Sequence, residues 1–582
     1  MSPDVLRIAN ASGFYGDRFS APREMLEGGP IDVLTGDYLA ELTLHILWKA
    51  RQKDAGAGYA TTFLGQMEQV LGEAQQRGVK IVTNAGGLNP AGLREQLAAL
   101  ASRLGLRGLK IAHIEGDDLL ARLPELQAGG HALAHQDDGR ALADAGVQPL
   151  LAHAYLGGWP IAAALQAGAD VVVCPRVSDA SLVLGPAAWH FGWGRDDWDR
   201  LAGAVVAGHV LECGAQATGG NYAFFREIAD LRHPGFPLAE LHADGSCVIT
   251  KHPGTGGAVS VGTVTAQLLY EIEGARYLNP DVVARFDSIR LAQQGPDRVA
   301  INGVRGEPAP LQAKLGIHFH AGYRNAMTLA LTGLEIEHKA RLVSDAIRAA
   351  LGERAGLELR LVRSDREDAA TNDEATAFLH VSVRDADRHK VGRAFTAPLV
   401  ELALASYPGL YAAAPPQAES AYGGYWPTLV PAACVAPVVV SHDGTRIPVP
   451  MTSAEPCSLP LAVAARPPVP TGATVRVPLG RAFGARSGDK GQSANLGVWA
   501  RSPEGYGWLC QHLDVTRLKL LIGEVAPLEV IRHELPNLLA VNFVIRGLLG
   551  DRASTRMDAQ AKSLGEHLRS RVVELPESLA GG

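Results

Sequence analysis

Residues 169–222 read ADVVVCPRVSDASLVLGPAAWHFGWGRDDWDRLAGAVVAGHVLECGAQATGGNY, and this stretch indicates both the fold and the site. Its opening run, Ala169–Cys174, is short, apolar and rich in valine, as in a buried strand of a parallel sheet. The strand breaks at Pro175–Ser181. Residues 208–222 then combine histidine, glutamate and cysteine with glycines, which let a ligand approach the backbone. We therefore expect one wall of an active-site pocket here.

Strands and helices alternate on the N-terminal side of this stretch. Parallel sheets need such crossover helices, so the fold class is α/β, with helices on both faces of the sheet. The expected strands cover residues 5–10, 31–36, 78–84 and 109–114.

The remaining chain divides into two further parts. Residues from about 226 to 465 mix helices and strands without strict alternation, which indicates an α+β region completing a main unit over 1–465, whose parallel α/β part is about 1–225. Its expected elements include an amphipathic helix over 335–351 and an alternating strand over 377–383. A proline-rich linker at 466–472 follows. Two β-α-β pieces over 473–582 predict a small ferredoxin-like domain.

Composition excludes several classes of protein. The net charge is −7 over 582 residues with no basic block, so we expect no nucleic-acid partner. No apolar run reaches the roughly 18–20 residues that span a bilayer, and residues 1–5 do not resemble a signal peptide. The six cysteines are scattered without a C-x-x-C pair, which favours reduced thiols and a cytoplasmic location.

Several candidate residues follow expected strands. Because the carboxyl ends of parallel strands meet at one edge, Asn84, Glu115 and Arg176 are expected to share a pocket there. Asp37 and Glu41 are four residues apart at the start of an expected helix, so their carboxylates would share a face. Two such carboxylates can serve as acid and base, although acidic residues in a first turn also complement the helix dipole.

Arg176 precedes Ser178 and Asp179 where a helix is expected over 180–189. An arginine beside a helix N-terminus can clamp a carboxylate or phosphate. The alternative is that Ser178 or Asp179 simply caps the helix. The two roles are compatible.

His209, Glu212 and Cys213 share one face if they continue a helix. A cysteine–histidine pair could attack a thioester, whereas His209 and Glu212 alone could transfer a proton next to a carbonyl. Since buried cysteines are usually inert, we favour His209 and Glu212 as the catalytic pair.

Other polar groups lie on glycine-rich loops or strands. Lys251 precedes the loop 252–260 and could hold phosphate, or that loop is an ordinary turn. The expected loop 480–491 carries Arg486, Asp489 and Lys490, which could bind a ligand or form an interface with the main domain, or the loop is an ordinary soluble turn. His318 and His320 form a histidine pair without an evident third ligand, so we expect no metal site.

The segments 14–18, 36–41, 84–87 and 169–222 together resemble the acyclic terpene utilisation (AtuA) family, and 485–491 resembles the ferredoxin-fold domain that often follows it. Pro175 departs from the glycine expected before Arg176. The resemblance implies bacterial catabolism of citronellol- and geraniol-type compounds or other branched acyl groups. Such pathways proceed through acyl-CoA thioesters and a biotin-dependent carboxylase. No particular reaction is implied.

Two functions of different class follow. The first is an acid–base enzyme, a lyase, hydratase or thioester-acting enzyme, that acts on a branched acyl-CoA or carboxylate without a redox cofactor. The second is a non-catalytic binding or scaffold subunit that docks to an acyl-CoA carboxylase. A dehydrogenase is a weaker third hypothesis because no G-x-G-x-x-G fingerprint is present. We expect a homo-oligomer with acyl-CoA as the ligand.

Overall fold

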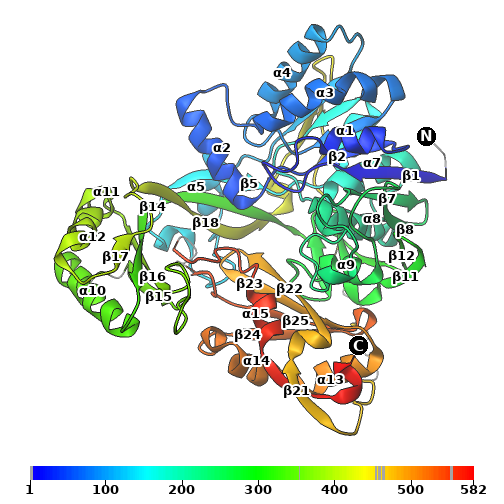
Figure 1. Ribbon diagram of the computed structural model, residues 1–582. Coiled ribbons are helices and arrows are strands. Elements are labelled where there is room, and N and C mark those ends of the chain that lie inside the picture. Colours follow the sequence, from blue (N-terminus) through cyan, green and yellow to red (C-terminus); the bar gives the residue numbers. More distant parts are fainter. Residues whose placement is uncertain are drawn as a thin grey trace.

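A computed structural model describes residues 4–352, 354, 356–452, 455, 460–461, 466–550 and 555–581 (Figure 1). Residues 1–3, on which the signal-peptide argument partly rests, and Cys457 lie outside the described residues. The other five cysteines are free thiols.

An eleven-stranded sheet forms the centre of the main region. Its middle is parallel, as predicted, in the order β1-β2-β3-β6-β4. Antiparallel strands that the sequence did not reveal extend it on both sides. The parallel strands are β1 (Val5–Asn10), β2 (Val33–Gly36), β3 (Lys80–Thr83), β6 (Val171–Val173) and β4 (Ile111–Glu115). The added strands are β7 (Pro237–His242), β8 (Cys247–Lys251), β12 (Arg298–Asn302) and β11 (Arg290–Gly295) beyond β1, and β19 (Val438–Val440) and β20 (Arg446–Pro448) beyond β4.

Helices cover both faces of this sheet, which confirms the predicted fold class. Alternate residues of a strand point to opposite faces, so Val171 and Val173 pack in one core and Val172 in the other. The first core takes α1 (Ala21–Glu27), α3 (Thr61–Arg77) and α4 (Pro90–Arg103). The second takes α6 (Trp159–Gln166), α7 (Ser181–Phe191), α8 (Trp198–Leu211) and α9 (Val261–Leu268).

A second sheet is built on one long strand, β14 (Gln312–Thr332). Its first half lies beside the main sheet, and its second half carries a lobe that projects sideways (Figure 1). The alternation predicted for 377–383 is confirmed, since Leu379, Val381 and Val383 are buried under the predicted helix α10 (Ile336–Leu351). The other members are β5 (Pro149–Ala154), β15 (Leu357–Val362), β16 (Thr376–Asp385), β17 (Leu410–Ala412) and β18 (Ser420–Pro431), with α12 (Arg393–Ala405) packed on the lobe.

The C-terminal domain has the predicted ferredoxin-like character. Helices cover one face of its four-stranded sheet, β22-β23-β25-β24, and the other face meets the main region. Along β23, Leu496 and Val498 enter the domain's own core, whereas Trp499 stacks on Tyr222 of the main region. The elements are β22 (Phe483–Lys490), β23 (Ser493–Ala500), β24 (Val530–Leu535), β25 (Ala540–Ile545), α13 (Pro503–His512), α14 (Val515–Leu521) and α15 (Leu564–Ser570), with β21 (Thr474–Pro478) paired to β26 (Val572–Pro576).

Three local predictions need correction. The expected loop 480–491 is mostly strand β22, because residues 483–490 pair with β23 over their full length. The helix expected at Asp37 is α2 (Glu41–Lys53), so Asp37 precedes it instead of sharing its face with Glu41. The strand expected over 109–114 is β4 (Ile111–Glu115), so Glu115 is the last residue of this strand instead of following it.

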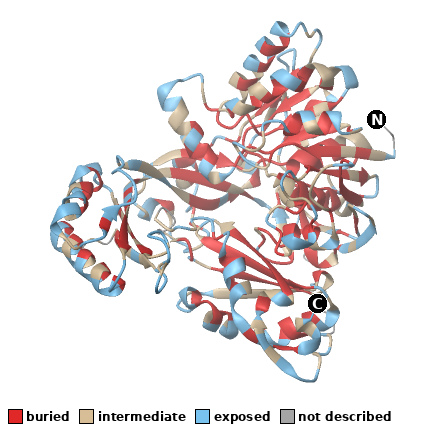
Figure 2. Cartoon of the chain, viewed as in Figure 1, coloured by how far each residue is buried: buried red, intermediate tan, exposed pale blue. Residues whose placement is uncertain are grey.

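Burial is concentrated in the sheets, whereas the outer faces of the helices are exposed (Figure 2). Among the described residues no helix is both long and apolar enough to cross a membrane.

Candidate functional site

The carboxyl edge of the parallel strands gathers three predicted site residues. Asp37 follows β2, Asn84 follows β3 and Arg176 follows β6. Asn84 Nδ2 donates to Asp37 Oδ1 at 2.6 Å, and its own Oδ1 accepts from the backbone N–H of Tyr38 at 2.7 Å. Asn84 thus holds the Asp37 carboxyl at the sheet edge, a contact that the sequence did not predict because Asp37 was expected to share a helix face with Glu41.

Arg176 is the cation at this edge, and it is 2% exposed. Its Nη2 donates to Asp179 Oδ1 at 2.5 Å and its Nη1 donates to the carbonyl oxygen of Leu39 at 3.0 Å. Neither Ser178 nor Asp179 caps α7, whose N-cap is Ala180. Burial and the charge of Asp179 raise the pKa of Asp37 well above its usual value, although Arg176 opposes this shift.

The second sheet adds two residues to the same site. The guanidinium carbon of Arg176 lies 4.2 Å from the ring centroid of Tyr155, which follows β5. Tyr155 Oη donates to Glu41 Oε1 at 2.9 Å, and Lys314 Nζ lies 3.4 Å from the same oxygen. Burial alone would raise the pKa of Glu41, but the charges of Lys314 and Arg176 lower it below its usual value. Glu41 is therefore ionised.

His209 and Glu212 form the predicted pair at the end of α8. His209 Nδ1 lies 3.1 Å from Glu212 Oε1, and the imidazole packs beside the rings of Tyr277 and Phe286. Burial and the charge of Lys490 lower the pKa of His209 to about 4. Burial and nearby carboxylates raise the pKa of Glu212 well above its usual value. The surroundings therefore favour the uncharged form of both groups, a neutral imidazole and a protonated carboxyl group.

Unpartnered atoms mark this pair as a candidate reaction centre. Glu212 Oε2 and both ring nitrogens of His209 are buried without a hydrogen-bond partner among the described residues. Buried polar atoms in native proteins are nearly always bonded, so each exception needs a physical reason. A ligand that supplies the missing partner is one such reason.

The C-terminal domain completes the site with β22. Lys490 Nζ donates to the carbonyl oxygen of Glu271 at 3.0 Å, and the guanidinium of Arg486 lies over the ring of Tyr270 at 4.2 Å. Burial and the charge of Glu271 raise the pKa of Asp489 to about 7. The three predicted residues of this segment therefore border the same acidic cluster as Glu212, whose pKa is also raised by Glu271.

Three other predicted residues have different partners. Glu115 pairs with His113 at 2.9 Å and with Arg446 at 2.8 Å. Lys251 pairs with Asp297 at 3.1 Å and donates to the carbonyl oxygen of Thr255 in the loop that follows it. These contacts favour an ordinary turn over a phosphate-binding loop. Ser178 Oγ accepts a hydrogen bond from Asn279. Each of these three side chains is therefore held by a partner within the protein: Arg446 for Glu115, Asp297 for Lys251 and Asn279 for Ser178.

The structure also gives the surroundings of Cys213 and of the two histidines, His318 and His320. Burial and the charge of Glu212 raise the pKa of Cys213 well above its usual value, so the group is a thiol and a poor nucleophile. His318 Nε2 forms a hydrogen bond with the carbonyl oxygen of Glu41, whereas His320, the other histidine of the predicted pair, is exposed. No cluster of three or more metal-ligating side chains occurs in the part of the chain that the structure describes.

Sequence reasoning missed Tyr155, Lys314 and Glu271. Tyr155 and Lys314 meet because β5 pairs with β14, a strand far from it in the sequence, and no local motif surrounds either residue. Glu271 has a positive φ of 56°, an uncommon conformation that sequence spacing does not reveal. These residues could not be assigned to the site before the sheets were placed together.

The fold and the site define a mixed α/β protein whose buried acid–base network is bordered by a C-terminal ferredoxin-like domain. The profile of the acyclic terpene utilisation family protein AtuA matches residues 6–441, and that of the AtuA ferredoxin-like domain matches residues 477–574. The chain belongs to the acyclic terpene utilisation family. Comparisons with curated proteins and with solved structures give no significant match.

Proposed function

We propose that this protein is an acid–base enzyme of acyclic terpene degradation that transfers a proton next to the carbonyl group of a branched acyl thioester or carboxylate. The observation that carries the proposal is the uncharged, buried His209–Glu212 pair with Glu212 Oε2 unpartnered. Enzymes tune such groups by burial and neighbouring charge so that they exchange protons near neutral pH.

Glu212 contacts the substrate, and His209 accepts a proton from Glu212 during the reaction and later returns it. Glu212 Oε1 lies 3.1 Å from His209 Nδ1, close enough for a proton on the carboxyl group to pass to the imidazole. When Oε2 accepts a proton from the carbon next to the carbonyl, Oε1 passes its own proton to Nδ1. The C–H electron pair moves to the carbonyl oxygen and forms an enolate. The reverse transfer returns a proton to carbon.

Cations near the pair stabilise the negative charge that develops on the substrate. Lys490 and Arg176 both act on the pKa of Glu212, so they lie within electrostatic range of its carboxyl group. Preorganised charges directed at a developing oxyanion commonly provide several kcal/mol of transition-state stabilisation. Arg176 is held by Asp179 and Leu39 and needs no reorganisation during the reaction.

Enolate formation is a step shared by hydratases and carbon–carbon lyases, so the test should detect that step directly. The protein is incubated in D₂O with 3-methylbutanoyl-CoA, 3-methylbut-2-enoyl-CoA and the free acids, and deuterium incorporation next to the carbonyl is followed by NMR. We expect exchange by the wild type and a loss of about 10²–10⁴-fold in Glu212→Gln. Glu115→Gln is the matched carboxyl-to-amide control and should exchange normally.

An alternative outcome would favour the binding or scaffold function. If the wild type binds these compounds but exchanges no deuterium, the acid–base proposal is wrong. Capture of a biotin-dependent carboxylase would then support a docking subunit. The proposed homo-oligomer is a separate question, which light scattering of the purified chain answers.

A further inference from the structure

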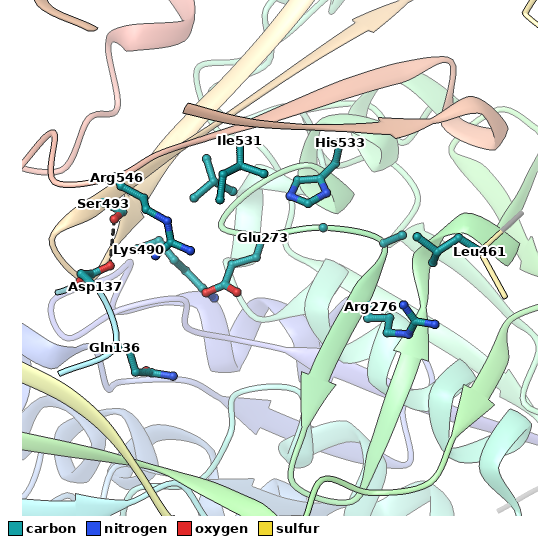
Figure 3. Close-up of a pocket in the computed structure, with 13 residues that line it drawn as sticks. Gln136, Asp137, Glu273, Arg276, Leu461, Lys490, Ser493, Ile531, His533 and Arg546 are labelled. Carbon is teal, nitrogen blue, oxygen red and sulfur yellow. Dashed lines mark hydrogen bonds between the residues drawn. The ribbon is translucent and has the colours of Figure 1, made fainter. Parts of the chain in front are cut away.

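A cavity of about 390 Å³ lies between the main region and the ferredoxin-like sheet (Figure 3). Residues 136–137 and 273–276 line it from the main region. The strands β24 and β25 line it from the C-terminal domain. Its size falls within the range of about 300–1,000 Å³ that is usual for small-molecule sites.

The cavity has an apolar wall and a cationic end. Ile531 and Val544 form the apolar wall, on the face of the ferredoxin-like sheet turned toward the main region. Lys490 and Arg546 lie together at one end, and the Glu273 side chain points toward them (Figure 3). Glu273 is exposed, so its carboxylate can stay hydrated when an anion binds at the cationic end.

Two other charged residues of the lining are already engaged. Asp137 accepts a hydrogen bond from Ser493 Oγ at 2.9 Å, and Arg276 Nε donates to both carboxylate oxygens of Glu307. Arg546 differs from them. Its Nε is buried without a hydrogen-bond partner among the described residues, and its ion pair with Glu529 is long, at 3.6 Å.

Lys490 connects this cavity with the buried site. Its side chain lines the cavity, while its Nζ donates to the carbonyl oxygen of Glu271. Its charge also acts on the pKa values of His209 and Glu212. A ligand at the cationic end of the cavity therefore lies beside the residue that borders the acid–base pair.

We infer that this interdomain cavity admits the substrate and binds an amphipathic anion, with Lys490 and Arg546 holding the anionic group and Ile531 and Val544 holding a short branched apolar segment. The inference rests on the proposed function for the statement that the bound ligand then reacts at the His209–Glu212 pair. Carboxylate and phosphate share the required chemistry, so the anion can belong to a free acid or to a phosphorylated thioester carrier.

Calorimetry on the full chain tests the cavity with four probes: 3-methylbutanoate, 3-methylbutanoyl-CoA, coenzyme A and inorganic phosphate. We expect the wild type to bind the branched acid or its thioester, and Arg546→Ala to bind at least tenfold more weakly. Arg546→Lys should recover part of the affinity. Arg517→Ala, which removes an exposed arginine of α14 in the same domain, should bind as the wild type does.

The probes identify the source of the anion. Binding of the free acid points to a carboxylate, and binding of the thioester and coenzyme A without the free acid points to a carrier phosphate. Val544→Phe, which fills the apolar wall, should weaken either ligand, with an unchanged circular dichroism spectrum as the check of folding. The inference is overturned if no probe binds the wild type, or if Arg546→Ala and Val544→Phe both bind within twofold of it.

Glu212→Gln separates this inference from the proposed function. If Glu212→Gln binds the probe normally but exchanges no deuterium, both are supported. If it still exchanges deuterium while Arg546→Ala loses binding, the proposed function is wrong and the cavity stands. If deuterium exchange needs Glu212 but is indifferent to Arg546 and Val544, the substrate reaches the pair by another route and the cavity inference is wrong.

Discussion

Two buried groups of ionisable side chains in this protein differ in how completely they are bonded. Arg285 donates from Nε and Nη2 to Asp287 at 2.8 and 2.6 Å, and from Nη1 to Glu307 at 2.9 Å. At the other group, Glu212 Oε2 and both nitrogens of His209 lack hydrogen-bond partners among the described residues. The Arg285 network has used its donors within the protein, whereas the His209–Glu212 pair has atoms available to a ligand.

The difference shows how a structural ion network can be told from a reaction site. A buried polar atom left unbonded costs about 1–3 kcal/mol, so folding alone favours the arrangement around Arg285. Exceptions concentrate at functional sites, where a local cost is tolerated because the site must bind something else. The following predictions test this distinction, from the largest expected effect to the smallest.

Arg285→Ala should destabilise the protein by about 3–5 kcal/mol, because it leaves Asp287 and Glu307 buried without their cation. Urea unfolding measures the change. The control is Arg305→Ala, which removes an exposed arginine paired with Asp199 and should cost less than about 1 kcal/mol. Equal effects of the two variants would contradict a structural role for the buried network.

Glu212→Gln should become more stable relative to the wild type as pH rises above about 5. The raised pKa keeps Glu212 protonated in the folded state, whereas the unfolded carboxyl ionises above its ordinary pKa and stabilises the unfolded chain. The wild type therefore loses up to about 1.4 kcal/mol per pH unit that the amide variant does not lose. Chemical unfolding at pH 5, 6, 7 and 8 measures this difference.

His209 acts in the opposite direction and at lower pH. Its folded pKa of about 4 means that stability falls as pH drops from the usual histidine range toward 4. Since His209 is present in both proteins, measurements above pH 6.5 isolate the contribution of Glu212. A stability difference that does not change between pH 6.5 and 8 would show that Glu212 is ionised in the folded protein.

Glu115→Gln should change stability by less than about 1 kcal/mol, because the half-buried carboxylate and the exposed Arg446 form a partly solvated pair. Deuterium exchange into the substrate should be unaffected. A loss of exchange comparable with that of Glu212→Gln would place Glu115 in the site after all.

Cys213→Ser should have the smallest effect, with exchange within about twofold of the wild type. Burial raises the pKa of the thiol, so the thiolate needed for nucleophilic attack is scarce near neutral pH. Alkylation of Cys213 by iodoacetamide at pH 7.5, located by peptide mass spectrometry, should be slower than that of a free cysteine model. Rapid alkylation would restore the nucleophile hypothesis.

Features that depend on neighbouring residues in the sequence could be predicted, whereas features that depend on contacts between distant residues could not. The apolar run Ala169–Cys174 and the alternation of Leu379, Val381 and Val383 predicted strands correctly, because these patterns reflect side-chain burial on one or both faces of a sheet. The start of α2 was misplaced by four residues, since Asp37 bonds Asn84, which follows the neighbouring strand β3, instead of beginning the helix. Long-range hydrogen bonds of that kind leave no local signal.

The sequence by itself determined the parallel sheet, the ferredoxin-like domain and the position of Asn84 and Arg176 at one sheet edge. It also determined the spacing that lets His209 meet Glu212, because residues three apart are neighbours on a helix. Only the tertiary structure brought Lys314 and Lys490 to the site and showed that Glu115, the last residue of β4, is bonded to His113 and Arg446. Only the tertiary structure fixed the protonation of the site, because a pKa depends on burial and on charges that arrive from distant parts of the chain.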